Sequence, residues 1–428
     1  MTAEIAILNH SAVALAADSA VTIKTDTATK IYNSVDKIFE LHETEPVGVM
    51  VYNQMSFLGY PIETLIKNFR KELKTKPQKL QTIKDYKKEL ISWLQSRFAS
   101  QLEGDNSNVL AIYSNIIFDV KSAIANRTLY RGKLISKNFN RNAVELSVEL
   151  LKELKKQKIL AGFDENTLRT IRRKYSQQVR KEISSPIYGM KPSQKTIAAI
   201  EAYCHEYLIR KLTNLKTGFV IAGFGDSQDL PALEAFEIDG ILEGNLRYAD
   251  LHSHNLETDH EKSHIISFAQ DDVIKLFLEG VDSSLFEYVR SQIEHLPKNI
   301  TESDLFAAVH PDNKTKLSNI FSRFSQDLIE NIRKYKLNHF DNRIRKFLAV
   351  LPKQEMANLA KSLIDLTSLQ RRVTSAAETV GGDVDLALIS KSDGFVWISR
   401  KHYFKAHLNP RFLANRYRSS TSDQGTPE

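Results

Sequence analysis

The stretch TAEIAILNHSAVALAADSAVT, residues 2–22, decides the fold of this chain. Small and β-branched residues fill EIAIL (4–8) and AVALAADSAVTI (12–23), and the polar triplet NHS separates the two runs. Such runs are typical of buried strands, and a short polar turn between them predicts a hairpin. The chain therefore begins with β structure, and we expect further strands over residues 36–41 and 46–52.

Two long segments have a different periodicity. Apolar residues recur every three or four positions over residues 74–211 and again over 270–375, which predicts helices. Strand signals return in residues 217–225, 233–242, 263–269, 383–390 and 395–400, the last two being joined by the turn KSDG. Strands at both ends and in the middle of the chain, with helices between them, predict a layered α+β fold.

The composition excludes several classes of protein. No apolar run approaches the length of a membrane helix, and the first twenty residues do not resemble a secretion signal. A single cysteine, Cys204, excludes an intrachain disulfide and a thiolate zinc site. We expect a cytoplasmic protein. The net charge of +7 does not favour nucleic-acid binding, because the basic residues are densest in helical stretches where a solvated face explains them.

Thr2 is a candidate nucleophile once Met1 has been removed. The hydroxyl of an N-terminal threonine can attack a carbonyl while its own α-amine accepts the proton, because that amine titrates near neutral pH. A second-position threonine is common in proteins, so its neighbours have to support the assignment.

The segment 2–22 resembles the opening of proteasome β subunits, in which a threonine, a strand and a turn lead to an AADS-x-x-T motif. Sixteen positions separate Thr2 from Asp18, as in that family. SVDKIFEL (34–41) resembles the family's lysine strand and places Lys37 on its lysine. The resemblance implies that Lys37 stabilises the neutral amine of Thr2 and that Asp18 orients Lys37.

Further positions are assigned by the same resemblance. Thr22 matches the residue whose backbone pairs with an extended substrate, and a backbone N–H near Tyr52 and Asn53 would form the oxyanion hole. The family has a glycine pair where this chain has Tyr52 and Asn53. Ser267 and Glu378 are the candidates for two supporting catalytic positions, a serine in a glycine-flanked loop and an acid before a glycine pair.

The later blocks FVIAGFGDSQDLPALEAFEIDG (219–240) and ETVGGDVDLALISKSDGFVWISR (378–400) resemble the central and closing hairpins of the family. The resemblance implies a four-layer αββα sandwich of the N-terminal-nucleophile (Ntn) hydrolases, with inserted helical regions. The expected division is core at 1–73, 214–280 and 353–408, helical insertions at 74–213 and 281–352, and a disordered tail at 409–428.

The function implied is hydrolysis of peptide or amide bonds through an acyl-enzyme on Thr2. The partners implied are a peptide or protein substrate, further copies of the chain in a homo-oligomer, and an unfoldase or another protein that binds the helical insertions. Two alternatives stay open: an inactive relative that forms assemblies or binds partners, and a small-molecule amidase.

A histidine-rich segment raises the question of a metal. LHSHNLETDHEKSH contains His252, His254, His260 and His264 together with Asp259. The spacing matches no metallohydrolase motif, and a polar linker between two strands explains the segment. We therefore expect no metal and no other cofactor.

Overall fold

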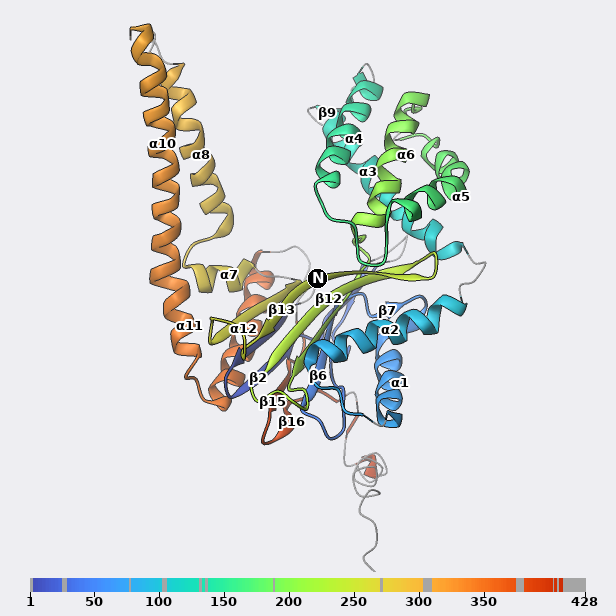
Figure 1. Ribbon diagram of the computed structural model, residues 1–428, viewed down its shortest axis with the longest axis vertical. Helices are drawn as coiled ribbons and strands as arrows, with labels where there is room; N and C mark the ends of the chain where they lie inside the picture. The colour runs from blue at the N-terminus through green and yellow to red at the C-terminus, as the bar shows by residue number, and fades with distance from the viewer. Residues whose placement is uncertain are drawn as a thin grey trace, which may run out of the picture. The chain divides into compact units, whose positions relative to one another are not determined.

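The computed structural model describes two compact units, residues 1–38 with 260–428 and residues 39–259 (Figure 1). Within them, the placed residues are 3–24, 29–76, 78–101, 106–130, 133–134, 138–187, 189–269, 272–302, 310–374, 381–402, 404–405 and 408–410. None of the helices in these ranges is both long and apolar enough to cross a membrane. Each unit contains one five-stranded antiparallel sheet and several helices, so the mixed α and β character predicted from the sequence is confirmed.

The sheet of the first unit has the strand order β14-β1-β2-β15-β16. It brings the start of the chain beside its last hairpin, because β2 pairs with both β1 and β15. The strands are β1 (Ala3–Asn9), β2 (Ala12–Ala17), β14 (Ser263–Ala269), β15 (Asp385–Ser390) and β16 (Gly394–Ser399), and a separate ribbon is formed by β3 (Val21–Lys24) and β4 (Thr29–Tyr32).

Side-chain alternation along β1 gives this sheet two distinct faces. Ile5 and Ile7 pack into a core with Met356 and Ile364 of helix α12 (Lys353–Thr374). The intervening residues, Glu4 among them, point to the opposite face, and every residue of β1 is buried. A charged residue therefore lies inside the protein on the face of β1 that does not pack against α12.

The remaining helices of the first unit include a long antiparallel pair, α8 (Ser283–Thr301) and α10 (Pro311–Lys336), which run side by side in Figure 1. We call this pair the arm. No residue of α8 is buried. The shorter elements at its base are α7 (Asp272–Glu279), the π-helical turn η2 (Leu337–Asp341) and α11 (Asn342–Leu348).

The sheet of the second unit has the order β13-β12-β11-β6-β5. Helices α1 and α2 share a core with one face of it. Gly240 on β12 lies close to α3, since a Cβ there would lie 2.7 Å from Ile112 Cδ1. The elements are β5 (Ile38–Glu40), β6 (Val47–Asn53), β7 (Ser56–Phe57), β8 (Tyr60–Pro61), α1 (Ile62–Thr75), α2 (Ile83–Gln101), β11 (Thr217–Gly223), β12 (Ala232–Leu242) and β13 (Asn245–Asn255).

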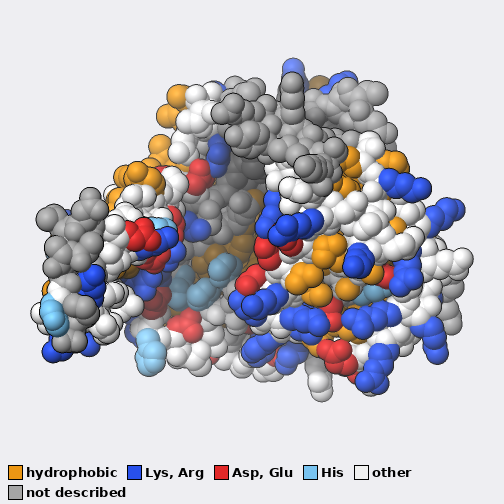
Figure 2. Space-filling model, turned by 90° about the horizontal axis from the view of Figure 1, so that it is seen from above, with side chains coloured by type: hydrophobic (Ala, Val, Ile, Leu, Met, Phe, Trp, Pro, Cys, Tyr) orange, Lys and Arg blue, Asp and Glu red, His pale blue; other side chains and the backbone are white. Residues whose placement is uncertain are grey.

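Four helices of the second unit form a bundle with its own apolar core: α3 (Ser107–Thr128), α4 (Phe139–Lys155), α5 (Glu165–Ile183) and α6 (Gln194–Arg210). A short ribbon, β9 (Leu129–Tyr130) with β10 (Lys133–Leu134), accompanies them. Seen from above, Lys and Arg side chains are scattered over this part of the surface among acidic and apolar ones (Figure 2). This mixture fits the solvated helix faces expected from the sequence.

Two buried polar groups mark the second unit. Arg247 of β13 donates hydrogen bonds to the carbonyls of Leu208 at 3.0 Å and Lys211 at 2.6 Å, at the end of α6, and to Asp239 Oδ2 at 3.1 Å. In the bundle, His205 Nδ1 lies 2.5 Å from the Tyr113 hydroxyl. Burial lowers the pKa of His205 to about 4, so its ring is neutral at pH 7.

The prediction of a polar linker around His252 and His254 was wrong. Both residues lie in β13, paired with Ala235 and Leu233 of β12, and their rings stack at 6.0 Å. Most side chains on this stretch of β13 are exposed, so the strand has polar residues on both faces and lacks the apolar alternation by which strands are found.

Each unit contains one of the two tryptophans of the chain. Trp93 lies on α2 and Trp397 on β16. An arginine stands over each indole: Arg97 is 5.4 Å from the Trp93 ring centroid and Arg400 is 4.8 Å from that of Trp397. Both contacts are cation–π interactions within a single unit.

Candidate active site

The start of β1 is fastened to Asp18, which follows β2. The Ala3 N–H donates to Asp18 Oδ1 at 3.1 Å, and the Asp18 N–H donates to the Ala3 carbonyl at 3.1 Å. Thr2 itself lies outside the described residues. Because Ala3 is bonded to Thr2, the carboxylate of Asp18 is held one residue away from the predicted nucleophile.

Lys37 lies between two carboxylates at this point. Its Nζ is 2.5 Å from Asp18 Oδ1 and 3.0 Å from Glu4 Oε1, and the three side chains are at most 1% exposed. The predicted proximity of Asp18 and Lys37 is therefore found, with Glu4 added. Lys30, the neighbouring lysine considered as an alternative, is exposed on β4.

These three side chains form one buried ionic cluster. Both carboxylates contact the Lys37 ammonium, and all three side chains are at most 1% exposed. Removing the ammonium would leave both carboxylates buried without it, which costs several kcal/mol. The cluster therefore depends on Lys37, and the Ala3–Asp18 hydrogen bonds place it beside the first residue of β1.

A glycine pair closes the other side of Asp18. The Gly381 N–H donates to Asp18 Oδ2 at 3.1 Å, and the Ser19 N–H donates to the Gly381 carbonyl at 3.3 Å. Gly382 has φ +79°, and a Cβ there would lie 2.8 Å from Asn33 Cβ. Only glycine fits this position without displacing the loop, so the pair has a structural role in orienting Asp18.

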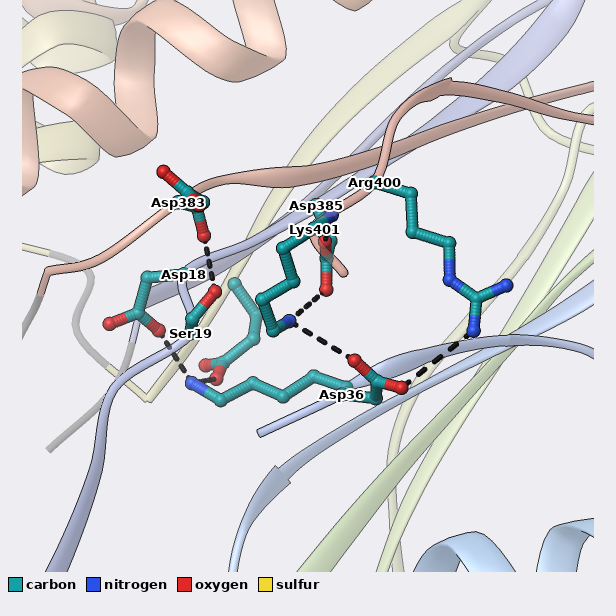
Figure 3. Close-up of polar contacts among 9 residues, drawn as sticks. Asp18, Ser19, Asp36, Asp383, Asp385, Arg400 and Lys401 are labelled. Atoms are coloured by element: carbon teal, nitrogen blue, oxygen red, sulfur yellow. Dashed lines mark hydrogen bonds and ion pairs between the residues drawn. The ribbon is translucent and has the colours of Figure 1, made fainter. Parts of the chain in front are cut away.

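A second group of charges holds the segment before Lys37 (Figure 3). Lys401 forms ion pairs with Asp385 and, at 3.3 Å, with Asp36, and its backbone N–H donates to Asp385 Oδ1 at 2.9 Å. Arg400 lies 3.7 Å from Asp36. Asp36 and Lys37 are adjacent, so fixing Asp36 to the end of the last hairpin also fixes the backbone from which Lys37 reaches Asp18.

A cavity of about 240 Å³ adjoins Asp18 within the first unit. The glycine pair and one side of α12 line it, and its charged lining side chains besides Asp18 are Asp365 and Arg372. The lining residues are Asp18, Ile364, Asp365, Ser368, Leu369, Arg372, Gly381, Gly382 and Val384.

The other predicted site residues fall in different places. Glu378 lies outside the described residues. Thr22 is in β3, where it pairs with Ile31. Ser267 on β14 stands opposite Ile5, so it shares the face of Ile5 and the sheet separates it from Glu4. The structure therefore does not bring Ser267 to the Lys37 group.

Tyr52 and Asn53, predicted beside the oxyanion hole, belong to the second unit. Tyr52 is buried, and its hydroxyl donates to Glu237 Oε1 at 3.2 Å. Its ring covers Gly218, where a Cβ would lie 2.0 Å from the ring. Asn53 has φ +65°, a conformation that glycine adopts most readily and asparagine next. Asparagine thus meets a backbone requirement at the end of β6.

Glu4 and the Asp36–Lys401 pair were not found from the sequence. Glu4 had a usable signal: it is the only charged residue in the apolar run AEIAIL, and it stands two positions from Thr2. Residues two apart on a strand share a face. The glycine pair was noted only as the landmark after Glu378, and its contact with Asp18 was not predicted. Gly381 and Lys401 contact the first forty residues only after the last hairpin has paired with β2.

Comparison with known proteins gives weak structural similarity only. No protein-family model matches the chain, and no curated protein matches it significantly. Among solved structures, Anbu (ancestral beta-subunit) from Yersinia bercovieri is similar with a TM-score of 0.30 and 8% identity, over 100% of this chain and 99% of that one. Anbu from Hyphomicrobium sp. strain MC1 gives a TM-score of 0.29 and 9% identity, over 100% and 99%. Because these scores are low, the functional argument rests on the geometry of the site.

Proposed function

We propose that this chain is an Ntn hydrolase that cleaves peptide or amide bonds with Thr2 as its nucleophile. One observation carries the proposal. Asp18 Oδ1 accepts hydrogen bonds from both Lys37 Nζ and the Ala3 N–H, and so joins a buried lysine to the residue that follows Thr2. A buried lysine held by carboxylates at the first residues of a chain is an arrangement suited to activating an N-terminal hydroxyl.

The reaction proceeds in two steps. The Thr2 hydroxyl oxygen attacks the carbonyl carbon while the α-amine takes its proton, and the tetrahedral intermediate then collapses, with that proton passing to the leaving amine. Water, deprotonated by the same amine, attacks the acyl-enzyme and releases the acid and the free Thr2 hydroxyl. Lys37 Nζ, held by Asp18 and Glu4, would stabilise the negative charge that develops near it.

The substrate and the fold follow from the same proposal. An extended peptide would pair with the backbone at Thr22 on β3, and a backbone N–H near Asn53 would bind the oxyanion. Glu378 would support the amine. Each sheet packs helices on one face and has a strand buried along its whole length, β1 in one and β11 in the other. In the proposed fold the two sheets would be the middle layers of an αββα sandwich.

The experiment combines intact mass, N-terminal sequencing and covalent labelling with an epoxyketone or β-lactone probe. We expect the active species to begin at Thr2 and to carry one probe on it. Thr2→Ala should abolish labelling and hydrolysis while the Tm stays within about 2–4 °C of the wild type. Ser11→Ala, which removes an exposed hydroxyl in the β1–β2 turn, is the matched control and should keep both.

Two results would refute the proposal: equal labelling of Thr2→Ala, or full activity in a species that retains Met1. If the wild type neither labels nor cleaves any peptide or amide offered, the protein is an inactive relative of this class.

A further inference from the structure

The arm is built from two helices that share a continuous seam. On α8 the half-buried residues recur at alternating spacings of three and four, and they include Phe286, Ile293 and Pro297. On α10 the corresponding residues include Leu317, Phe321, Ser325 and Leu328. This is the spacing of two helices packed against each other along their length. The contact between the two helices therefore explains the burial of one stripe of residues on each.

Each helix has a second apolar stripe, which is exposed. Its members on α8 are Leu285 (53% exposed), Tyr288 (63%), Val289 (38%) and Leu296 (43%). Its members on α10 are Ile320 (60%) and Phe324 (58%). Leu285 and Leu296 immediately precede seam residues of α8, as Ile320 and Phe324 do on α10. When two antiparallel helices lie side by side, the pair has two broad faces. Residues that immediately precede seam residues lie on the same broad face in both helices, and residues that immediately follow seam residues lie on the other.

The opposite broad side is polar. The residues that immediately follow the seam residues are Glu287, Glu294 and Lys298 on α8, and Ser322 and Gln326 on α10, all exposed. The arm is thus a two-helix layer with one apolar side and one polar side. A layer of this kind is half of a four-helix bundle.

We propose that the apolar side of the arm binds the same side of the arm in a second copy of this chain, and that the two arms form an antiparallel four-helix bundle. The inference concerns assembly and does not depend on the proposed hydrolase activity. A two-fold axis across the middle of the arm would place α10 against α10 of the second copy, running in the opposite direction, and α8 against α8.

The size of the apolar patch suits a dimer. With aromatic side chains of about 150–250 Å² and aliphatic ones somewhat smaller, six side chains about half exposed offer roughly 500 Å² of apolar surface per arm. Interface cores are about 65% apolar, so such a patch corresponds to roughly 800 Å² buried per copy, the standard size of a specific interface.

The sequence around the patch is self-complementary. Lys316 and Asp327 flank Ile320 and Phe324 on α10, are exposed, and each immediately precedes a half-buried seam leucine. The two are eleven residues apart and nearly symmetric about the patch. The proposed axis would therefore set Lys316 of one copy opposite Asp327 of the partner subunit.

Paired cysteines test this arrangement in the full-length protein. Two cysteines eleven residues apart on one helix are about 16 Å from each other and cannot form a disulfide within a chain. Lys316→Cys with Asp327→Cys should therefore give a disulfide-linked dimer on a non-reducing gel. Thr315→Cys with Gln326→Cys has the same spacing on the polar side and should remain monomeric on that gel. The native Cys204 is buried and should not interfere.

Charge exchange gives a second, independent readout by sedimentation. Lys316→Asp alone and Asp327→Lys alone should weaken the dimer at least tenfold, and the double exchange should restore it. The double variant Ile320→Glu with Phe324→Glu should disrupt the dimer formed by the arms, so the mass measured by sedimentation should fall by half. The proposal is overturned if the 316/327 cysteine pair links copies no better than the 315/326 pair, as it would if the patch held a different protein.

Discussion

Each unit of this protein buries a charged group completely, and the two groups differ in their partners. Arg247 in the second unit faces one carboxylate, Asp239, and donates from Nε and Nη2 to two backbone carbonyls. Lys37 in the first unit faces two carboxylates, Asp18 and Glu4. Both are 0% exposed.

The difference separates a structural group from a candidate catalytic one. The Arg247 pair is neutral, and it ties the end of α6 to the sheet, which is a sufficient reason for its burial. The Lys37 group joins two carboxylates at the start of β1, beside the residue that follows Thr2. Burial of a charge therefore does not by itself indicate chemistry, whereas a buried lysine held by carboxylates beside a candidate nucleophile is consistent with it.

The largest effect is expected for Lys37→Ala. Hydrolysis or probe labelling should fall by more than about a thousandfold, because the cation beside Thr2 is lost, and unfolding free energy should fall by about 3–5 kcal/mol, because two buried carboxylates lose their partner. Lys37→Arg is the control: it should regain part of the stability and little of the activity, since a planar guanidinium cannot take the place of the ammonium. Near wild-type hydrolysis in Lys37→Ala would remove the distinction between the two charge groups.

Arg247→Met should cost a similar amount of stability, about 3–5 kcal/mol, because it leaves the Asp239 carboxylate buried without its cation. At temperatures where the variant is folded, its activity per folded molecule should equal that of the wild type. Combining it with Asp239→Asn should restore more than half of the lost stability in urea melts, because the Thr213 N–H still has an oxygen acceptor. An activity loss that persists in the double variant would mean that Arg247 is more than structural.

A third buried group, His205, makes the stability of the second unit depend on pH. The folded state holds His205 with its pKa lowered to about 4, mainly by burial, against 6.5 when unfolded. The unfolded chain therefore binds the extra proton, and stability should fall by about 3 kcal/mol as the pH drops from 6.5 to 4. His205→Gln should be less stable at pH 7 and should lose this part of the pH dependence. An unchanged slope in the variant would assign the dependence to other groups.

The smallest effect is expected for Glu4→Gln, which removes one carboxylate charge from the Lys37 group while keeping its shape. Folding should change by only about 1 kcal/mol, because Lys37 retains Asp18. The acid limb of the pH–rate profile should move to lower pH by about one unit, since a negative charge near the base no longer favours its protonated form. Glu355→Gln, an exposed carboxylate on α12, is the control and should move nothing. A lower rate with an unmoved profile would leave Glu4 a purely structural role.

The sequence predicts those site residues that lie near Thr2 along the chain. Asp18 directly follows one strand and Lys37 directly precedes another, and the structure places Lys37 Nζ 2.5 Å from Asp18 Oδ1. Gly381 and Lys401 lie more than three hundred residues away, and only the pairing of β15 with β2 carries them to the site. Ser267 is not brought to the Lys37 group because it pairs with Ile5, and a shift of one residue in register decides on which face of a strand a side chain lies.

The fold follows the same rule. The first and last hairpins were predicted because each is a pair of apolar runs around a turn, and both are found as β1–β2 and β15–β16. The strand β13 was missed because its side chains are mostly exposed and polar. A strand is recognised in a sequence by an apolar run or by alternating apolar and polar residues, and β13 has neither over residues 250–255.

The placement of the two tryptophans makes the protein its own spectroscopic reporter. Trp93 emits from α2 and Trp397 from β16, each beneath an arginine. Unfolding removes the cation from the ring and exposes the indole to water, so both intensity and wavelength should change. Trp93→Phe and Trp397→Phe would each leave one emitter, and their melting curves would show whether the units unfold in one transition or in two.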